Sequence, residues 1–302
     1  MNLIIIATGY AFRNKNSFSY KISEEFKKIH TNNQSVVCNA GGIWEILDSK
    51  NSLFQHNNTI IHLRQAHPNN PEKILKRRGF LMVNNPKTNC LTSHKINTME
   101  LLKDKIYIPN YLDVTKVNKF KIIDFFKKNP RPFFIKGIMS GTPMKKRLPL
   151  LIDIDDHEKL IKKIFASKIY FNQEEIYIQT LFNFDRLYRV ILIDQKAIAT
   201  FVDFPDKNHM ASVCLNKKIN FVKKPDINLL NLASLIQKKI KADISYIDIF
   251  WSKKQGYALS EINSACDLLM HEKYANINIA KKIAENLYKK AKQKLCKNIN
   301  KL

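Results

Sequence analysis

Residues 244–251 and 257–263 constrain the fold of this chain more than any other part of its 302-residue sequence. Residues 244–251 are rich in β-branched and aromatic residues, which favour a strand, and residues 257–263 are expected to form a second strand. The polar stretch between them contains a glycine and suits a hairpin loop. If residues 253–256 form that loop, the antiparallel register is set, and Asp248 lies directly opposite Glu261.

This register predicts a cluster of oxygen ligands. Glu261 and Asn263 are two residues apart, so they share one face of their strand. Directly opposed residues lie about 4.5–5.5 Å apart at Cβ, and like charges at that distance repel. Two carboxylates and an amide oxygen suit a hard cation such as Mg²⁺, which also keeps waters or takes phosphate oxygens. The alternative is an exposed hairpin with solvated acidic residues, and the hairpin alone leaves both interpretations open.

The composition adds a strong positive charge. The formal net charge is +25, from 51 Lys and Arg against 26 Asp and Glu. Such a charge favours an acidic partner, namely a nucleic acid, a nucleotide or an acidic peptide. The lysines are spread along the chain, as they are in a sequence biased towards Lys, Asn and Ile, so nucleic acid is not the expected partner. At this length and 45% hydrophobic residues, we expect two or three lobes with a real core.

Cysteine spacing and apolar runs restrict the compartment. The five cysteines are scattered without a CxxC pair, which predicts neither a disulfide framework nor a zinc site. The apolar run at the amino terminus has no basic residue before it and does not resemble a signal peptide. No apolar run approaches the roughly 20 residues that cross a bilayer. We therefore expect a cytoplasmic protein without a membrane partner.

The first 85 residues predict an α/β lobe. Buried strands alternate with amphipathic helices, as expected for a parallel sheet covered on both faces. The expected strands are residues 3–7, 35–38 and 59–63, and the expected helices are residues 18–30 and a segment after Pro71. Thr8-Gly9 is interpreted as a strand-to-helix turn, with a phosphate-binding turn as the alternative.

The following residues predict a mixed α+β region. Ser93 is expected to cap a helix over residues 93–102, and an edge strand is expected over residues 106–111. Further strands are expected at 132–136, 149–152 and 175–182, helices at 117–128, 155–165, 226–240 and 277–295, and a hairpin at 187–203 with its turn at Asp194-Gln195. The glycine-containing loop 137–147 is either a phosphate-binding loop or an ordinary turn.

Arg189 lies between apolar residues in the first strand of that hairpin. In a simple two-residue hairpin it faces Thr200. It is either an exposed strand residue or an anion clamp, because a guanidinium group matches the geometry of a carboxylate or a phosphate.

In their order and spacing, these segments resemble the ATP-grasp superfamily, and within it the RimK-like ligases that add glutamate to protein or peptide carboxylates. The resemblance covers about residues 80–290. It rests on six motifs: FLMVNNPKTNCLTSHKINTMELL, PFFIKG, IYIQTLF, FDRLYRVILIDQKAIA, YIDIF with LSEINSACDLL, and INIAKKIAENL.

The resemblance implies a role for each matched residue. Lys95 and Lys136 would bind the nucleotide. Gln179, Thr180 and Leu181 would hold adenine through backbone groups. Arg189 is placed at the substrate-side arginine. Asp248, Glu261 and Asn263 would hold Mg²⁺, with Mn²⁺ as the alternative ion.

The resemblance also implies an α/β and α+β architecture, an ATP-grasp fold with an N-terminal α/β lobe. The expected divisions are residues 1–88 for that lobe, 89–180 for a central lobe with the phosphate loop, and 181–302 for a C-terminal lobe with the metal site. Three departures from the family pattern bear on the substrate more than on the nucleotide. The 137–147 loop is poor in glycine, the linker reads Gln179-Thr180 where Gln-Glu is common, and Asn208 lacks the glycines that usually follow it.

The expected activity is that of an ATP-dependent carboxylate–amine ligase acting through an acylphosphate on a peptide, protein or amino acid. An acidic peptide would suit the basic surface, and a homo-oligomer is compatible with the sequence. Two alternatives stay open. One is a small-metabolite or acid–thiol ligase, and the other is a non-catalytic nucleotide- or nucleic-acid-binding homologue.

Overall fold

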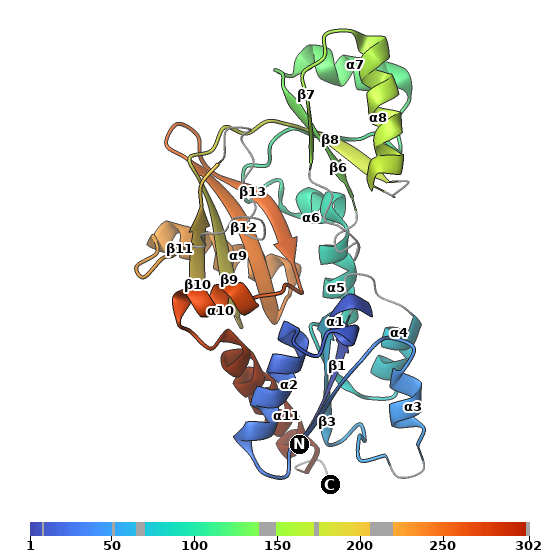
Figure 1. The fold of residues 1–302 in the computed structure, drawn as a ribbon, viewed down its shortest axis with the longest axis vertical. Helices are drawn as coiled ribbons and strands as arrows, with labels where there is room; N and C mark the ends of the chain where they lie inside the picture. The colour runs from blue at the N-terminus through green and yellow to red at the C-terminus, as the bar shows by residue number, and fades with distance from the viewer. Residues whose placement is uncertain are drawn as a thin grey trace.

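The computed structural model describes residues 1–7, 9–49, 52–64, 70–138, 149–171, 175–205 and 220–299. The described chain contains three β-sheets (Figure 1), and the strands of each sheet come from one continuous stretch of sequence. These stretches are residues 2–83, 111–180 and 186–263. Each stretch falls inside one of the three lobes expected from the sequence, although the lobe boundaries themselves stay a prediction.

The N-terminal sheet is parallel, with strand order β2-β1-β3-β4. Its strands are β1 (Asn2–Ala7), β2 (Gln34–Cys38), β3 (Thr59–Arg64) and β4 (Leu81–Val83). Its helices are α1 (Gly9–Arg13), α2 (Phe18–Ile29), α3 (Ile43–Leu47) and α4 (Asn70–Arg77). Every residue of β1 and β3 is buried, because helices pack on both faces of the sheet. The expected α/β lobe is confirmed in its strands and main helices.

The central sheet is antiparallel, with order β5-β8-β6-β7. Its strands are β5 (Tyr111–Asp113), β6 (Phe133–Gly137), β7 (Leu150–Ile152) and β8 (Ile176–Thr180). Helices α7 (Lys119–Lys128) and α8 (His157–Phe171) cover one face. The expected edge strand over residues 106–111 is wrong, because Tyr107 bridges to Ala258 of the neighbouring sheet and strand pairing in the central lobe starts only at Tyr111.

The helix expected over residues 93–102 starts at Lys95, and a second helix precedes it. Helix α5 (Pro86–Ser93) ends at the serine that was predicted to be a cap, and α6 (Lys95–Leu102) starts two residues later. Asn85 caps α5 ahead of a proline, which is a favourable start for a helix. The cap of α6 is His94, whose side chain accepts from the N–H group of Asn97.

The C-terminal sheet is antiparallel, with order β11-β10-β9-β12-β13. Its strands are β9 (Arg186–Ile193), β10 (Lys196–Asp203), β11 (Asn220–Phe221), β12 (Ile244–Ser252) and β13 (Gly256–Asn263). Helix α9 (Ile227–Ile240) packs on one face. On the other side are α10 (Leu269–Ala275) and α11 (Ile279–Ile299), and α11 runs back against α2 of the N-terminal lobe (Figure 1).

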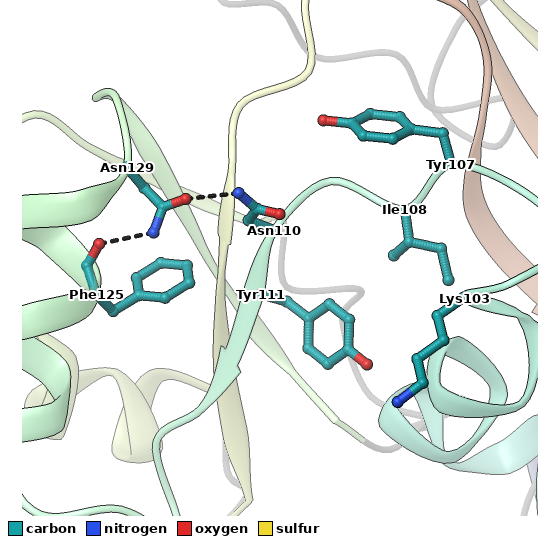
Figure 2. Close-up of a pocket in the computed structure, with 7 residues that line it drawn as sticks. All are labelled: Lys103, Tyr107, Ile108, Asn110, Tyr111, Phe125 and Asn129. Atoms are coloured by element: carbon teal, nitrogen blue, oxygen red, sulfur yellow. Dashed lines mark hydrogen bonds between the residues drawn. The ribbon is translucent and has the colours of Figure 1, made fainter.

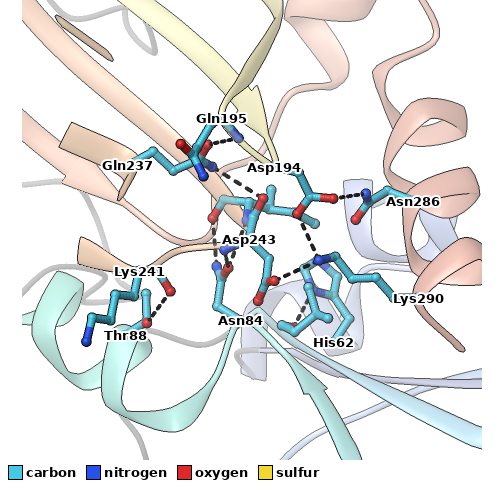
Figure 3. A network of polar contacts seen from close by, with 12 residues as sticks. His62, Asn84, Thr88, Asp194, Gln195, Gln237, Lys241, Asp243, Asn286 and Lys290 are labelled. Atoms are coloured by element: carbon cyan, nitrogen blue, oxygen red, sulfur yellow. Dashed lines mark hydrogen bonds and ion pairs between the residues drawn. The ribbon is translucent and has the colours of Figure 1, made fainter. Parts of the chain in front are cut away.

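A polar network joins the N-terminal and C-terminal lobes (Figure 3). The fully buried Asn84 side chain donates to the Ile244 carbonyl at 2.7 Å and accepts from the N–H groups of Asp243 and Ile244. Lys290 of α11 pairs with Asp243 at 2.9 Å and with Asp194 at 2.8 Å. These contacts hold the end of β4, the start of β12 and the C-terminal helix together.

Among the helices in the ranges given above, none has both the length and the apolar composition that crossing a membrane requires. Of the segments singled out in the sequence, most of the 137–147 loop, Thr8 and Asn208 lie outside the described residues.

Candidate active site

The predicted pairing of Asp248 with Glu261 is confirmed, although the hairpin differs in detail. The loop is three residues long, because Ser252 pairs with Gly256, whose φ of +75° suits a glycine. A register shift next to Asp248 inserts one extra residue into β13. The shorter loop and the bulge offset each other, so the two acids still meet.

Arg189 lies beside Asp248 on the neighbouring strand β9. Its Nε and Nη2 donate to the two carboxylate oxygens of Asp248 at 2.7 and 2.6 Å, and each residue is only 5% exposed. The expected register is wrong, since a shift between Ala197 and Ala199 places Phe201 opposite Arg189 in place of Thr200. The alternative of an exposed arginine is also wrong. A buried pair of this geometry fixes the orientation of both side chains.

Two lysines lie near Glu261. Lys95 begins α6, and its Nζ lies 3.7 Å from Glu261 Oε1. The same Nζ donates to the Gly137 carbonyl at 3.3 Å. Lys136 on β6 donates to Gln179 Oε1 at 2.7 Å. The predicted nucleotide lysines and acidic residues therefore meet between the central and C-terminal sheets.

The pKa of Lys136 is lowered to about 8, chiefly because burial disfavours its charge. The positive charge of Lys95 lowers the pKa further, and the negative charge of Glu261 opposes both effects. A lysine in this position gains from an added anion, because that anion stabilises the protonated form.

Nucleotide affinity is expected to fall as the pH rises through 8. Below pH 8, Lys136 is already protonated and pairs with phosphate, whereas above pH 8 binding must first take up a proton, which costs up to about tenfold in affinity per pH unit. Calorimetric titration with ATP between pH 7 and 10 measures this dependence. In Lys136→Arg the profile flattens, and in the exposed control Lys121→Arg it stays as in the unaltered protein. A flat profile in the unaltered protein contradicts the expectation.

The segment predicted to hold adenine is already used in part by the protein. The N–H group of Thr180 donates to the Asn110 carbonyl at 2.8 Å, and that of Leu181 donates to the Pro132 carbonyl at 3.1 Å. These bonds remove both donors from contact with a base. Gln179 is buried and donates through Nε2 to the Pro109 carbonyl, so its side chain links Lys136 to the connection between the lobes. The adenine role of the segment stays a prediction.

The three predicted metal ligands fit a hard cation. Glu261 and Asn263 are partly exposed on the edge strand β13, and Asp248 lies opposite Glu261 with both of its carboxylate oxygens bonded to Arg189. In the described part of the chain, no three His, Cys, Asp or Glu side chains form a metal cage. Oxygen donors in this small number are those of a Mg²⁺ site in which phosphate and water supply the remaining oxygens.

A separate pocket of about 400 Å³ lies at the connection between the lobes (Figure 2). It is lined by Lys103, Tyr107, Ile108, Asn110, Tyr111, Phe125 and Asn129. Asn110 donates to Asn129 across it at 2.7 Å. None of the predicted site residues lines this pocket.

Sequence reasoning missed three residues next to the predicted site, namely Arg64, Tyr246 and Cys266. Arg64 ends β3, and its guanidinium donates to the Tyr246 hydroxyl and to the Cys266 carbonyl. The only local signal is an arginine at the end of a buried strand in TIIHLR, because ligands of parallel sheets bind at that edge.

The fold is similar to that of solved ATP-grasp ligases. A D-alanine–D-alanine ligase from Bacillus anthracis complexed with ATP has a TM-score of 0.72 at 12% identity, over 99% of each chain. The ligase PsnB complexed with a precursor peptide and AMPPNP has a TM-score of 0.68 at 12% identity, over 96% of this chain and 97% of that one. The macrocyclase MdnC from Microcystis aeruginosa MRC, bound with its precursor peptide, has a TM-score of 0.67 at 11% identity, over 95% and 99%.

At these identities the likeness shows the fold, which is the expected ATP-grasp fold with mixed helices and sheets. No curated protein matches the chain. A family model described as a RimK-like ATP-grasp domain matches residues 92–287, which is more than half of the sequence. The chain belongs to the RimK-like ATP-grasp family.

Proposed function

We propose that this protein is an ATP-dependent carboxylate–amine ligase that acts on a peptide, protein or amino acid through an acylphosphate. A substrate carboxylate oxygen would attack the γ-phosphorus of ATP, and ADP would leave. An amine would then attack the acyl carbon, so that phosphate leaves, the amine loses a proton and an amide remains. Family membership and the fold support this class of reaction.

The observation that carries the proposal is the meeting of charged side chains from three segments. Lys95 lies 3.7 Å from Glu261, Glu261 lies opposite Asp248, and Asp248 is bonded to Arg189. A triphosphate and a carboxylate repel each other, so their reaction requires positive charge at the point of approach. Lys95 and Arg189 would supply that charge, and the two acids would hold the metal ion that adds to it.

The side chains would divide this work. Lys95 and Lys136 would neutralise the phosphates, because both lie between the two sheets, and the lowered pKa of Lys136 rises when an anion binds. Arg189, held by Asp248, would present its guanidinium to the substrate side. Asp248, Glu261 and Asn263 would hold Mg²⁺, or Mn²⁺ with the same oxygen donors, and the bound ion neutralises phosphate charge.

An acidic substrate is favoured by the charge of the protein. The net charge of +25 draws acidic molecules to the surface. PsnB, MdnC and a Chryseobacterium gregarium ATP-grasp ligase were each solved with a peptide, which supports a peptide as one substrate to test.

A phosphate-release screen tests the proposal. Amino acids and acidic peptides are incubated with the protein, ATP and Mg²⁺, and products are identified by mass spectrometry. The expected result is release of one phosphate per amide formed, with a mass equal to the two substrates less one water. A product that forms only with thiols would replace the amide proposal by acid–thiol ligation. Absence of phosphate release above a Glu261→Gln control for every substrate would contradict it and favour a non-catalytic nucleotide-binding protein.

A further inference from the structure

Arg64 carries a buried charge that no acid of the described chain neutralises. Arg64 lies at the end of β3 and is 6% exposed. The guanidinium stacks over the Phe18 ring, 5.0 Å from its centroid, and Nε donates to Ser19 Oγ at 3.0 Å. Among the residues that the structure describes, its hydrogen-bond partners are the hydroxyl groups of Ser19 and Tyr246 and the carbonyl of Cys266, and none of them is a carboxylate. A buried cation held only by neutral groups gains from an added anion.

Arg64 reaches from the N-terminal lobe into the candidate active site. Its Nη1 donates to Tyr246 Oη at 3.3 Å, and its Nη2 donates to the Cys266 carbonyl at 2.5 Å. Tyr246 lies on β12, two residues before Asp248 and therefore on the same face of the sheet. The N-terminal lobe thus contacts the strand that carries a predicted metal ligand.

Cys266 also contacts Arg189. Arg189 Nη1 donates to Cys266 Sγ at 3.3 Å, while Nε and Nη2 of Arg189 bind Asp248. Two guanidinium groups from different lobes therefore contact one residue, and the contacts just described include a single carboxylate. Cys266 is partly exposed, and its Sγ also donates to the Asp267 carbonyl at 3.6 Å.

We propose that Arg64, Arg189 and Cys266 form a binding site for the carboxylate of the acid substrate, which we call the acid corner. A guanidinium fork matches a planar carboxylate, and Arg64 uses three of its five N–H donors in the contacts described. The identification of the anion as a substrate carboxylate rests on the proposed ligase function. The anion site itself rests on the geometry and charge alone.

Alkylation of Cys266 tests the acid corner without ATP. Iodoacetate carries a carboxylate and iodoacetamide is its neutral counterpart of similar size. In both reactions the thiolate sulfur attacks the methylene carbon and iodide leaves. The ratio of the two rates at one thiol cancels the fraction of thiolate, so it reports attraction of the anion. Mass spectrometry of peptides from the full-length protein gives this ratio for each cysteine.

Cys296 is the matched control within the same molecule. It is exposed beside Lys289 and Lys292, so it measures the effect of the generally basic surface. The iodoacetate-to-iodoacetamide ratio at Cys266 is expected to exceed that at Cys296 by about tenfold, because a cleft of one charge concentrates the opposite charge. In Arg64→Gln the excess is lost, and in Arg64→Lys part of it remains.

Competition keeps the test valid if Arg64→Gln does not fold. In the unaltered protein, glutamate should slow the reaction of iodoacetate at Cys266 and leave Cys296 unchanged. Equal ratios at the two cysteines would overturn the acid corner, and so would a failure of Cys266 to react with either reagent. An unchanged ratio in folded Arg64→Gln would also overturn it. The same holds if inorganic phosphate protects Cys266 and glutamate does not. An excess at Cys266 in a protein that fails the phosphate-release screen would retain the anion site and reject the ligase.

Discussion

Replacement of Glu261 by glutamine is expected to lower ATP turnover by at least about 100-fold, the scale of loss when groups that hold a metal are removed. Glutamine keeps the size of the side chain and one oxygen. It removes the negative charge that faces Asp248 and approaches Lys95 at 3.7 Å. Turnover is measured as phosphate release with the substrate identified in the screen.

The control for this variant is Glu285→Gln. Glu285 undergoes the same chemical change on α11, where it is half-exposed and only 3.9 Å from Lys281. Its turnover should equal that of the unaltered protein. Because Glu261 is partly exposed on an edge strand, thermal unfolding of Glu261→Gln should match the unaltered protein closely. Wild-type turnover in folded Glu261→Gln would remove this residue from the mechanism.

The second large effect is on stability. Arg189→Met is expected to lower the free energy of unfolding by about 3–5 kcal/mol, because it leaves the Asp248 carboxylate buried without its guanidinium partner. Asp248→Asn leaves the guanidinium without its acid and is expected to destabilise as well. In the double variant both charges are gone, so its loss should be smaller than the sum of the two single losses. Denaturant titration measures all three.

An exposed pair provides the comparison. Lys128 and Asp124 lie 2.8 Å apart on α7, with both side chains more than half exposed. The matched changes Lys128→Met and Asp124→Asn should each cost less than about 1 kcal/mol, the range of surface ion pairs. If Arg189→Met costs no more than Lys128→Met, the buried pair does not support the sheet as described.

Local patterns in the sequence predicted the acidic pair and missed its partner. Asp248 and Glu261 are close in the chain, so the two-residue period of strands and a short loop determine how they meet. The bulge in β13 was not predictable from the residues. It did not change the pairing of Asp248 with Glu261, because the loop is one residue shorter than expected and the bulge adds one residue. Arg189 pairs with Asp248 across 59 positions, and no local rule gives the register between β9 and β12.

The same limit explains the other misses. Arg64 and Tyr246 are 182 positions apart, and their contact depends on how two lobes pack. The break between α5 and α6 had a local signal, Asn85 followed by a proline, which the preference for Ser93 as a cap obscured.

The way the lobes are joined determines which part of the site stays assembled when the protein opens. The network around Asn84 and Lys290 makes one body of the N-terminal and C-terminal lobes, and α6, which carries Lys95, packs on that body against α9 and β13. The chain enters the central lobe through residues 103–110 and leaves it through residues 181–185. A swing of the central lobe would therefore carry Lys136 away, and it would have to break the hydrogen bonds of Lys95 to the Gly137 and Ile138 carbonyls. Arg189, Asp248 and Glu261 lie on neighbouring strands of one sheet, so they would stay together and could receive the next nucleotide.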